Sequence, residues 1–401
     1  MSDDRAGPAP WRAGFVAATT GEVTAPTTSS PTTPAAPGRR SPATRAIARL
    51  RRRGMHLVSS SALTAIAGVA RLHPRARPHA HGVEVLRDLP YLPGGSRDHL
   101  LDVYRPLTRP GPWPVVFYVH GGAFSLLSKD THWVMGLAFA RHGYLVVNIS
   151  YRLAPTHPFP AAIADTCAAW QWMVEHVEAL GGDLGRVAVA GESAGANLIT
   201  ALTLATTQRR PEPWARRAFD TGVAPHAALP FCGMLQVSDP ARFAEGRGSD
   251  SVAAPTAVAA VDRGKRRLPP LLDAAIRNCS DSYLGRREPH HSLDLADPLC
   301  VLERDLAPHG IERPLPPFFA AVGTRDPLLP DTRRLEKALA DLGVPCEARY
   351  YPGGIHAFHA MVWNRDARRC WRDALAFLDR HLRVRRARHP VHLALPAASQ
   401  R

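Results

Sequence analysis

Short runs of hydrophobic residues alternate with longer amphipathic segments from Val83 onward. The runs have the length of buried strands, and the segments between them repeat hydrophobic residues at the three- and four-residue steps of one helix face. Within residues 160–179, for example, Ile163, Cys167 and Trp170 share such a face. This alternation predicts an α/β fold in which helices cover both sides of a mostly parallel, eight-stranded sheet.

The predicted strands lie near residues 83–87, 99–104, 114–120, 144–150, 186–191, 223–232, 316–322 and 346–351. The predicted helices lie near residues 130–142, 160–179, 194–207, 331–342 and 361–381. Residues 239–295 interrupt the rhythm, being polar and glycine-rich at first and helix-like up to Leu284. We expect an insert that forms part of a cap over the sheet, although a solvated loop fits residues 239–267 equally well.

The most informative motif is Gly191-Glu192-Ser193-Ala194-Gly195, which joins a predicted strand to a predicted helix. A Gly-x-Ser-x-Gly turn in this position lifts the serine hydroxyl above the edge of the sheet. The N–H groups at the start of the following helix can stabilise a developing negative charge. Ser193 is therefore a candidate nucleophile.

A serine nucleophile needs a base and a residue that orients the base, and both follow in the expected order. Asp326 comes directly after the apolar run 317–323, and His356 lies in a loop after the predicted strand 346–351. Because parallel strands end at a common edge, we expect these side chains to meet Ser193 there. Asp165 and Asp297 are alternative acids, but we expect them to stabilise loops and turns.

A glycine pair follows the predicted strand 114–120. The backbone N–H groups of Gly121 and Gly122, together with that of Ala194, are candidates for an oxyanion hole. Each such donor contributes about 2.7–4 kcal/mol to lowering the barrier. Taken singly, these residues also have ordinary structural interpretations, as a helix cap, a turn residue and a loop histidine. Their joint order along the chain favours the catalytic interpretation.

The region from about Leu100 to Leu382 resembles the hormone-sensitive-lipase-like branch of the α/β-hydrolases, a bacterial esterase and lipase family. The resemblance rests on the two glycine motifs, on residues 101–106, 130–132, 151–155 and 158–162, and on the segments around Asp326 and His356. It implies Ser193 as the nucleophile, His356 as the general base and then acid, and Asp326 as the orienting residue. It also implies short- to medium-chain acyl esters as substrates, with no cofactor or metal.

The chain departs from the family pattern at three places. Ala123 occupies the fourth position of the oxyanion string, where the family has glycine, and Glu192 stands before the serine where Asp or Thr is more common. Ile355 and Ala357 flank the histidine, where the family usually has glycine after it. None of these changes removes a catalytic group.

The formal net charge of +15 arises at the two ends of the chain. Residues 1–80 hold 12 Arg and Lys against 3 Asp and Glu, and residues 381–401 hold 5 against none. The body between them is nearly neutral, which disfavours nucleic acid as a partner. Solvated basic tails are the simplest interpretation, and peripheral contact with an anionic membrane stays open.

We therefore divide the chain into four parts. Residues 1–42 have a low-complexity composition that predicts a disordered tail. Residues 43–80 form a basic amphipathic segment, interpreted first as a cap helix, with a membrane-surface helix or an export signal starting at Met55 as alternatives. Residues 81–382 are the catalytic domain, with residues 239–295 as a cap insert, and residues 383–401 are a basic C-terminal tail.

Six scattered cysteines lack the spacing of a metal site, and we expect all of them to be reduced, which favours a cytoplasmic location. The leading hypothesis is a serine carboxylic-ester hydrolase acting on a small-molecule ester. An amidase or formamidase on the same scaffold is an alternative, because only the leaving group differs. A catalytically dead, binding version of the scaffold is a second alternative. The sequence leaves the oligomeric state open.

Overall fold

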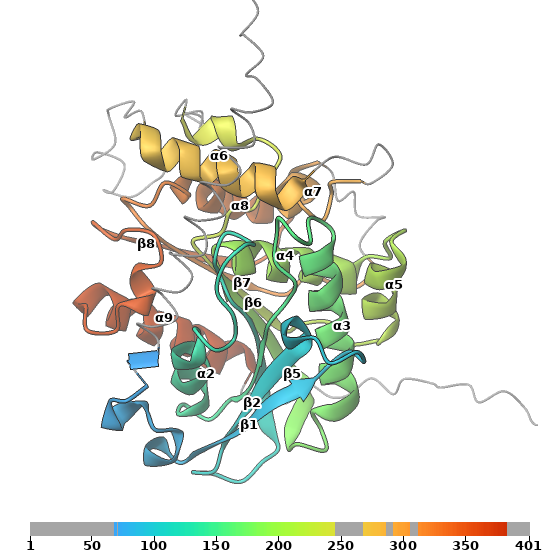
Figure 1. The fold of residues 1–401 in the computed structure, drawn as a ribbon, viewed down its shortest axis with the longest axis vertical. Helices are drawn as coiled ribbons and strands as arrows, with labels where there is room; N and C mark the ends of the chain where they lie inside the picture. The colour runs from blue at the N-terminus through green and yellow to red at the C-terminus, as the bar shows by residue number, and fades with distance from the viewer. Residues whose placement is uncertain (1–67, 70, 245–267, 286–291, 305–311, 383–401) are drawn as a thin grey trace, which may run out of the picture. The chain divides into compact units, whose positions relative to one another are not determined.

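The computed structural model describes residues 68–69, 71–244, 268–285, 292–304 and 312–382 (Figure 1). The chain divides into two units, Met1–Arg52 and Arg53–Arg401, and the first lies wholly outside the described residues. The predictions for residues 1–42 and 383–401, and for the cap helix within residues 43–67, therefore remain predictions. Within the described part, no helix is long and apolar enough to cross a membrane.

An eight-stranded sheet forms the centre of the fold, in the order β1-β2-β4-β3-β5-β6-β7-β8. β2 pairs antiparallel with both β1 and β4, and the pairs from β4 onward are parallel. The predicted mostly parallel sheet is confirmed. Its strands are Val83–Pro90 (β1), Leu100–Pro106 (β2), Trp113–Val119 (β3), Leu145–Ile149 (β4), Gly182–Glu192 (β5), Ala227–Phe231 (β6), Phe318–Gly323 (β7) and Cys346–Tyr351 (β8).

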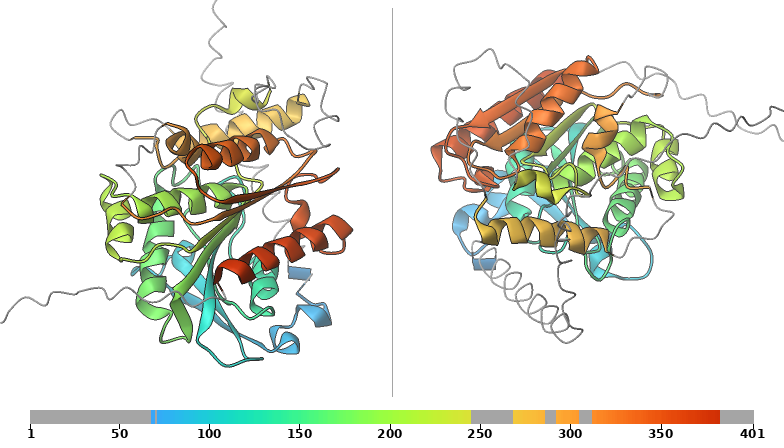
Figure 2. Two further views of the ribbon diagram at one scale, coloured as in Figure 1. Left: turned by 180° about the vertical axis from the view of Figure 1, so that it is seen from behind. Right: turned by 90° about the horizontal axis from the view of Figure 1, so that it is seen from above.

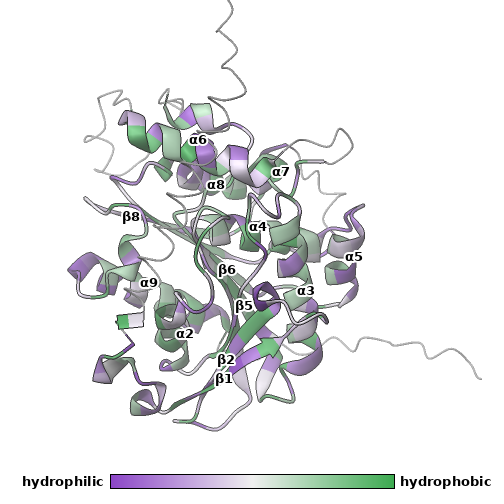
Figure 3. Ribbon diagram, in the orientation of Figure 1, coloured by the Kyte–Doolittle hydropathy of each residue, from purple (hydrophilic) through white to green (hydrophobic). Residues whose placement is uncertain are grey.

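Helices cover both faces of this sheet (Figure 2). On one face lie α2 (Trp133–Ala140) and α9 (Arg365–Leu382). On the other lie α3 (Ala161–His176), α4 (Ala194–Thr207), α5 (Pro213–Asp220) and α8 (Leu329–Asp341). Residues of β3 divide between the two layers: Phe117 packs into the α3 side, and Tyr118 packs into the α2 side. The central strands are correspondingly hydrophobic along their length (Figure 3).

Two of the described α-helices are absent from the sequence predictions. α5 follows the proline-rich stretch 211–213, and Pro213 occupies its first turn, where a missing N–H costs nothing. α7, Pro298–Glu303, is only six residues long and too short to show a helical period. Neither helix carries a predicted site residue.

The helical half of the predicted insert is present as α6, Pro270–Leu284. Its Tyr283 ring stacks on Phe124 with a centroid distance of 3.7 Å, and the Tyr283 carbonyl accepts a hydrogen bond from the N–H of Phe159. α6 therefore packs against the chain that follows Gly121 and Gly122. Residues 245–267 of the insert lie outside the described residues, so the choice between lid and loop stays a prediction.

The described end of the predicted cap segment contains two short 3-10 helices, η1 (Pro74–Ala76) and η2 (Pro78–His81). Just before them, the Arg71 guanidinium donates a hydrogen bond of 2.7 Å to the Asp130 carbonyl. Asp130 belongs to the 130–132 motif that follows the glycine pair. This part of the segment is thus attached to the loop between β3 and α2.

Candidate active site

Ser193 lies at the sharp turn between β5 and α4. Its φ of 53° and ψ of −114° are strained for a residue with a side chain, typically by about 1–3 kcal/mol. The turn exists because the flanking glycines permit close packing: a Cβ on Gly195 would lie 2.1 Å from the Val119 carbonyl oxygen. The N–H of Ser193 donates to the Phe231 carbonyl at 2.9 Å, which ties the turn to the end of β6.

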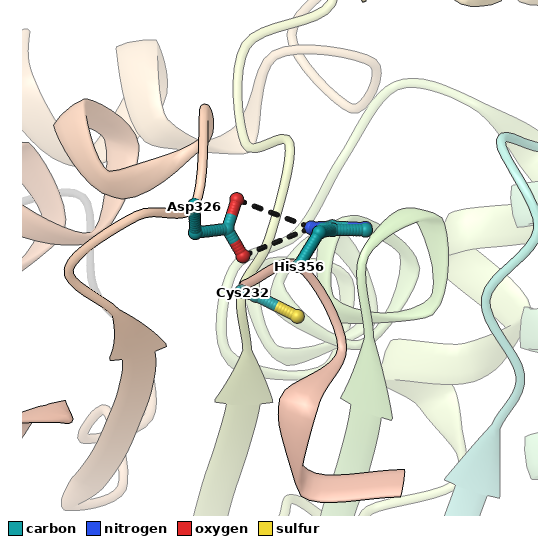
Figure 4. A group of neighbouring side chains, drawn as sticks. All are labelled: Cys232, Asp326 and His356. Atoms are coloured by element: carbon teal, nitrogen blue, oxygen red, sulfur yellow. Dashed lines mark hydrogen bonds and ion pairs between the residues drawn. The ribbon is translucent and has the colours of Figure 1, made fainter. Parts of the chain in front are cut away.

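The structure brings the three predicted catalytic side chains together at one edge of the sheet. His356 Nε2 lies 3.0 Å from Ser193 Oγ, although 163 positions separate the two residues. His356 Nδ1 lies 2.9 Å and 3.1 Å from the two carboxylate oxygens of Asp326 (Figure 4). Asp326 follows β7 and His356 follows β8, as predicted from the strand ends.

The Asp326 carboxylate is held in place by the backbone. Its side chain is fully buried, and its Oδ1 also accepts a hydrogen bond of 2.8 Å from the N–H of Leu328. The His356 ring is less enclosed, with 37% of its side chain exposed. The arrangement leaves the imidazole open to a substrate while its orienting partner is fixed.

The pKa of His356 is raised well above its ordinary value of 6.5. Burial alone would lower this pKa, but the neighbouring Cys232 and Asp326 outweigh it. Because burial raises the pKa of the Cys232 thiol, that thiol is neutral near pH 7. We therefore attribute the raised histidine pKa to the negative charge of Asp326.

Cys232 is the part of this centre that the sequence did not indicate. It directly follows β6, is fully buried, and has a positive φ of 41°. Within the described residues, one ligand atom each from Cys232, Asp326 and His356 lie within 4.8 Å of one another (Figure 4). Sulfur, carboxylate and imidazole are zinc-binding groups, so these three residues could hold a metal ion. Such an ion would compete with the proton that His356 shares with Asp326, and the expectation of a metal-free site stays a prediction.

The candidate oxyanion groups lie beside the serine. Ala194 is the first residue of α4, and the first N–H groups of a helix have no acceptor within it. The Gly121 carbonyl is 2.6 Å from His120 Nδ1. Burial lowers the pKa of His120 to about 3, so the ring is neutral and its Nδ1–H donates to that carbonyl. The peptide unit between Gly121 and Gly122 is thereby fixed, with its N–H on the opposite side.

The alternative acids have other partners, as expected. Asp165 forms a two-pronged contact with the Arg152 guanidinium, with its shortest distance 2.7 Å. Asp297 Oδ1 accepts hydrogen bonds from the N–H groups of Val237 and Ser238 at 2.5 Å and 3.0 Å. Asp297 stabilises the loop after β6, while Asp165 anchors the segment that begins at Arg152.

Comparison with known proteins agrees with this geometry. A family model described as the α/β-hydrolase fold matches residues 116–360, more than half of the chain. The chain belongs to the α/β-hydrolase family. Within that family it falls in the hormone-sensitive-lipase-like branch, so the resemblance stated from the motifs is confirmed, and the chain is an enzyme.

Three curated relatives each match between 62% and 72% of this chain. Esterase LipI of Mycobacterium tuberculosis is 32% identical over 294 residues, which are 72% of this chain and 76% of that protein. Carboxylesterase NlhH of the same species is 33% identical over 282 residues, 69% of this chain and 73% of NlhH. An acetyl esterase of Salmonella dublin is 30% identical over 252 residues, 62% of this chain and 67% of that protein.

Solved structures show the same fold. A bacterial heroin esterase superposes with a TM-score of 0.62 at 24% identity, covering 82% of this chain and 92% of that chain. Esterase LipW from Mycobacterium marinum superposes with a TM-score of 0.59 at 26% identity, covering 80% of this chain and 89% of that chain. The likeness extends well beyond the matched motifs to most of the described fold.

Proposed function

We propose that this enzyme is a serine carboxylesterase that hydrolyses short- to medium-chain acyl esters through an acyl-enzyme intermediate. The observation that carries the proposal is the continuous chain of contacts from Ser193 Oγ through His356 to Asp326. Ester hydrolysis is also the activity named for the relatives LipI and NlhH. The acetyl esterase among the relatives supports the preference for short acyl groups.

The first half of the reaction forms the acyl-enzyme. His356 Nε2 takes the proton from the Ser193 hydroxyl as the oxygen attacks the ester carbonyl. The N–H groups of Gly121, Gly122 and Ala194 stabilise the oxyanion of the tetrahedral intermediate. The imidazolium then gives its proton to the departing alkoxide, which leaves as an alcohol.

The second half releases the acid. Water replaces the alcohol, His356 takes one of its protons, and the resulting hydroxide attacks the acyl-enzyme carbonyl. Collapse of the second tetrahedral intermediate returns the proton to Ser193 Oγ and frees the carboxylic acid. Asp326 keeps the same imidazole tautomer throughout and stabilises the imidazolium formed in each half.

A series of p-nitrophenyl esters from acetyl (C2) to palmitoyl (C16) tests both parts of the proposal. We expect kcat/KM of the wild type to be highest at the short to medium end of the series. Ser193→Ala should lower kcat by about 10⁶-fold for every member. Equal activity of the two proteins would refute the nucleophile, and a maximum at C16 would refute the chain-length assignment. An aryl formamide measured beside the butyrate ester separates esterase from amidase preference.

A further inference from the structure

Glu192, which directly precedes the serine, is buried between two histidines. Its Oε1 lies 2.7 Å from His132 Nε2, in a hydrogen bond. Its Oε2 lies 2.7 Å from His359 Nε2, in an ion-pair contact. All three residues are nearly inaccessible, with exposed fractions of 6% for Glu192, 6% for His132 and 2% for His359. We call these residues the Glu192 cluster.

The cluster contains an ionised carboxylate. Burial would raise the pKa of Glu192, but His132 and His359 outweigh burial and hold that pKa well below its ordinary value. A buried carboxylate is costly unless neighbouring groups compensate it, so the two histidines and Glu192 depend on one another. Oε1 is held by its hydrogen bond with His132, and Oε2 by the 2.7 Å contact with His359 Nε2, which lacks hydrogen-bond geometry.

Each member of the cluster comes from a different segment of the active site. Glu192 ends β5 and leads into Ser193. His132 directly precedes α2, on the segment that follows the oxyanion glycines. His359 lies in η6 (Phe358–Ala360), three residues after His356. One carboxylate therefore links the loop that carries the base to the turn that carries the nucleophile.

The cluster also contacts the backbone at Gly121 and the side chain of Phe231, the residue that holds the serine turn. A Cβ built on Gly121 would lie 3.0 Å from the Glu192 carbonyl oxygen and 3.1 Å from its Cγ, so Glu192 packs directly against that backbone. The His359 ring stacks on Phe231 at 4.8 Å and 20°. Phe231 in turn accepts the hydrogen bond from the N–H of Ser193.

We propose that Glu192, through His132 and His359, is a positioning residue that holds Ser193, the His356 loop and the Gly121 backbone in the geometry for reaction. The proposal rests on the proposed serine hydrolase function. Glu192 does not touch the reacting atoms. It acts by keeping the strained turn at Ser193 aligned with the base His356, which lies on a second loop, and with the oxyanion-hole backbone at Gly121, which lies on a third loop.

The test compares Glu192→Gln with a matched control, Asp183→Asn. Asp183 lies at the opposite end of the same strand, is 2% exposed, and pairs with Arg186 at 2.9 Å. Both variants replace a buried, paired carboxylate by an amide of the same shape. The control is about 20 Å from the serine, because Asp183 and Val187 pair with the neighbouring residues Pro114 and Val115, and the remaining strand steps are about 3.3 Å each. It therefore separates a local positioning effect from a general loss of stability.

For p-nitrophenyl butyrate, we expect Glu192→Gln to lower kcat at least tenfold and to change KM less than twofold. The rate at which a fluorophosphonate labels Ser193 should fall by a similar factor. Asp183→Asn should change kcat and the labelling rate less than twofold, whatever its effect on the free energy of unfolding. Glu192→Asp, which keeps the charge, should recover part of the lost rate.

A Glu192→Gln kcat within twofold of wild type, or a loss that Asp183→Asn reproduces, would overturn the positioning role. Should Glu192→Gln not fold, His359→Gln, which keeps the pair with His132, is judged by the same criteria. A different result would show that the proposed serine hydrolase function itself is wrong. In that case the wild type itself would neither hydrolyse the ester nor be labelled at Ser193.

Discussion

Gly323 and Gly354 lie backbone against backbone: a Cβ built on Gly323 would be only 2.1 Å from the Gly354 carbonyl oxygen. The same carbonyl accepts a hydrogen bond of 2.9 Å from the N–H of Arg325. Gly323 ends β7 just before Asp326, and Gly354 precedes His356. This contact brings the acid and base segments close enough for their side chains to meet.

Gly323→Ala should therefore separate Asp326 from His356. The added methyl group has no room, and a displacement of about 1 Å at a catalytic group costs about 10²-fold in rate. We expect kcat for p-nitrophenyl butyrate to fall by that order. Gly185→Ala is the matched control, because its Cβ would contact only the Asp183 side chain, 3.1 Å away. A Gly323→Ala enzyme as fast as the control would show that this contact does not set the geometry.

The pH dependence should follow His356. Only the neutral imidazole accepts the serine proton, so kcat/KM should rise with pH through a midpoint above 6.5. Asp326→Asn should move the midpoint to lower pH and reduce kcat by about 10⁴-fold. A wild-type midpoint at or below 6.5, or one that Asp326→Asn leaves in place, would contradict the assigned cause.

The same raised pKa has a consequence for folding. The folded state binds a proton at His356 more tightly than the unfolded state does. Its contribution to stability is therefore fully present below pH 6.5 and is lost as the pH rises through the folded-state pKa. Asp326→Asn should weaken this dependence of the unfolding free energy on pH. Urea unfolding of both proteins across this pH range measures it.

A buried ion pair away from the serine should matter for stability. Arg242 Nη2 lies 2.6 Å from Asp331 Oδ2, with exposed fractions of 5% and 0% for the two side chains. Arg242→Met would leave the Asp331 carboxylate buried without this partner, at a cost of about 3–5 kcal/mol. Urea unfolding measures the loss. The double variant Arg242→Met with Asp331→Leu should recover much of it, and the absence of any recovery would argue against the ion pair as the cause.

The cysteines should react slowly in the folded protein. All six are free, as expected from the sequence, and four of them are buried. Burial raises the pKa of the two less enclosed thiols, Cys279 and Cys346, to about 12. At pH 8 the reactive thiolate is therefore scarce. Iodoacetamide should modify few thiols in native protein and all six in denaturant, whereas rapid native modification of several would contradict the buried assignment.

The sequence predicted the parts of this enzyme that depend on local pattern. The strand ends before Ser193, Asp326 and His356 are visible as apolar runs followed by glycine or polar residues. Because parallel strands end at one edge, that local information sufficed to bring the three side chains to one place.

The remaining features depend on packing between distant segments. In the sequence, Glu192 stands out only as a departure from the family pattern, because nothing local indicates that His132 and His359 approach it. The position of Cys232 beside His356 follows from the length of β6, which the sequence placed only to within a few residues. To predict such contacts from the sequence, one would need to know the register of several strands at the same time.

Covalent labelling of the serine tests the central claim most directly. The native enzyme is treated with a fluorophosphonate, and the modified residue is located by peptide mass spectrometry. We expect one equivalent of label, on Ser193, together with loss of ester hydrolysis, and much slower labelling of the His356→Ala variant. An enzyme that hydrolyses p-nitrophenyl butyrate while Ser193 stays unlabelled, or that is inactivated by label on another residue, would contradict that claim.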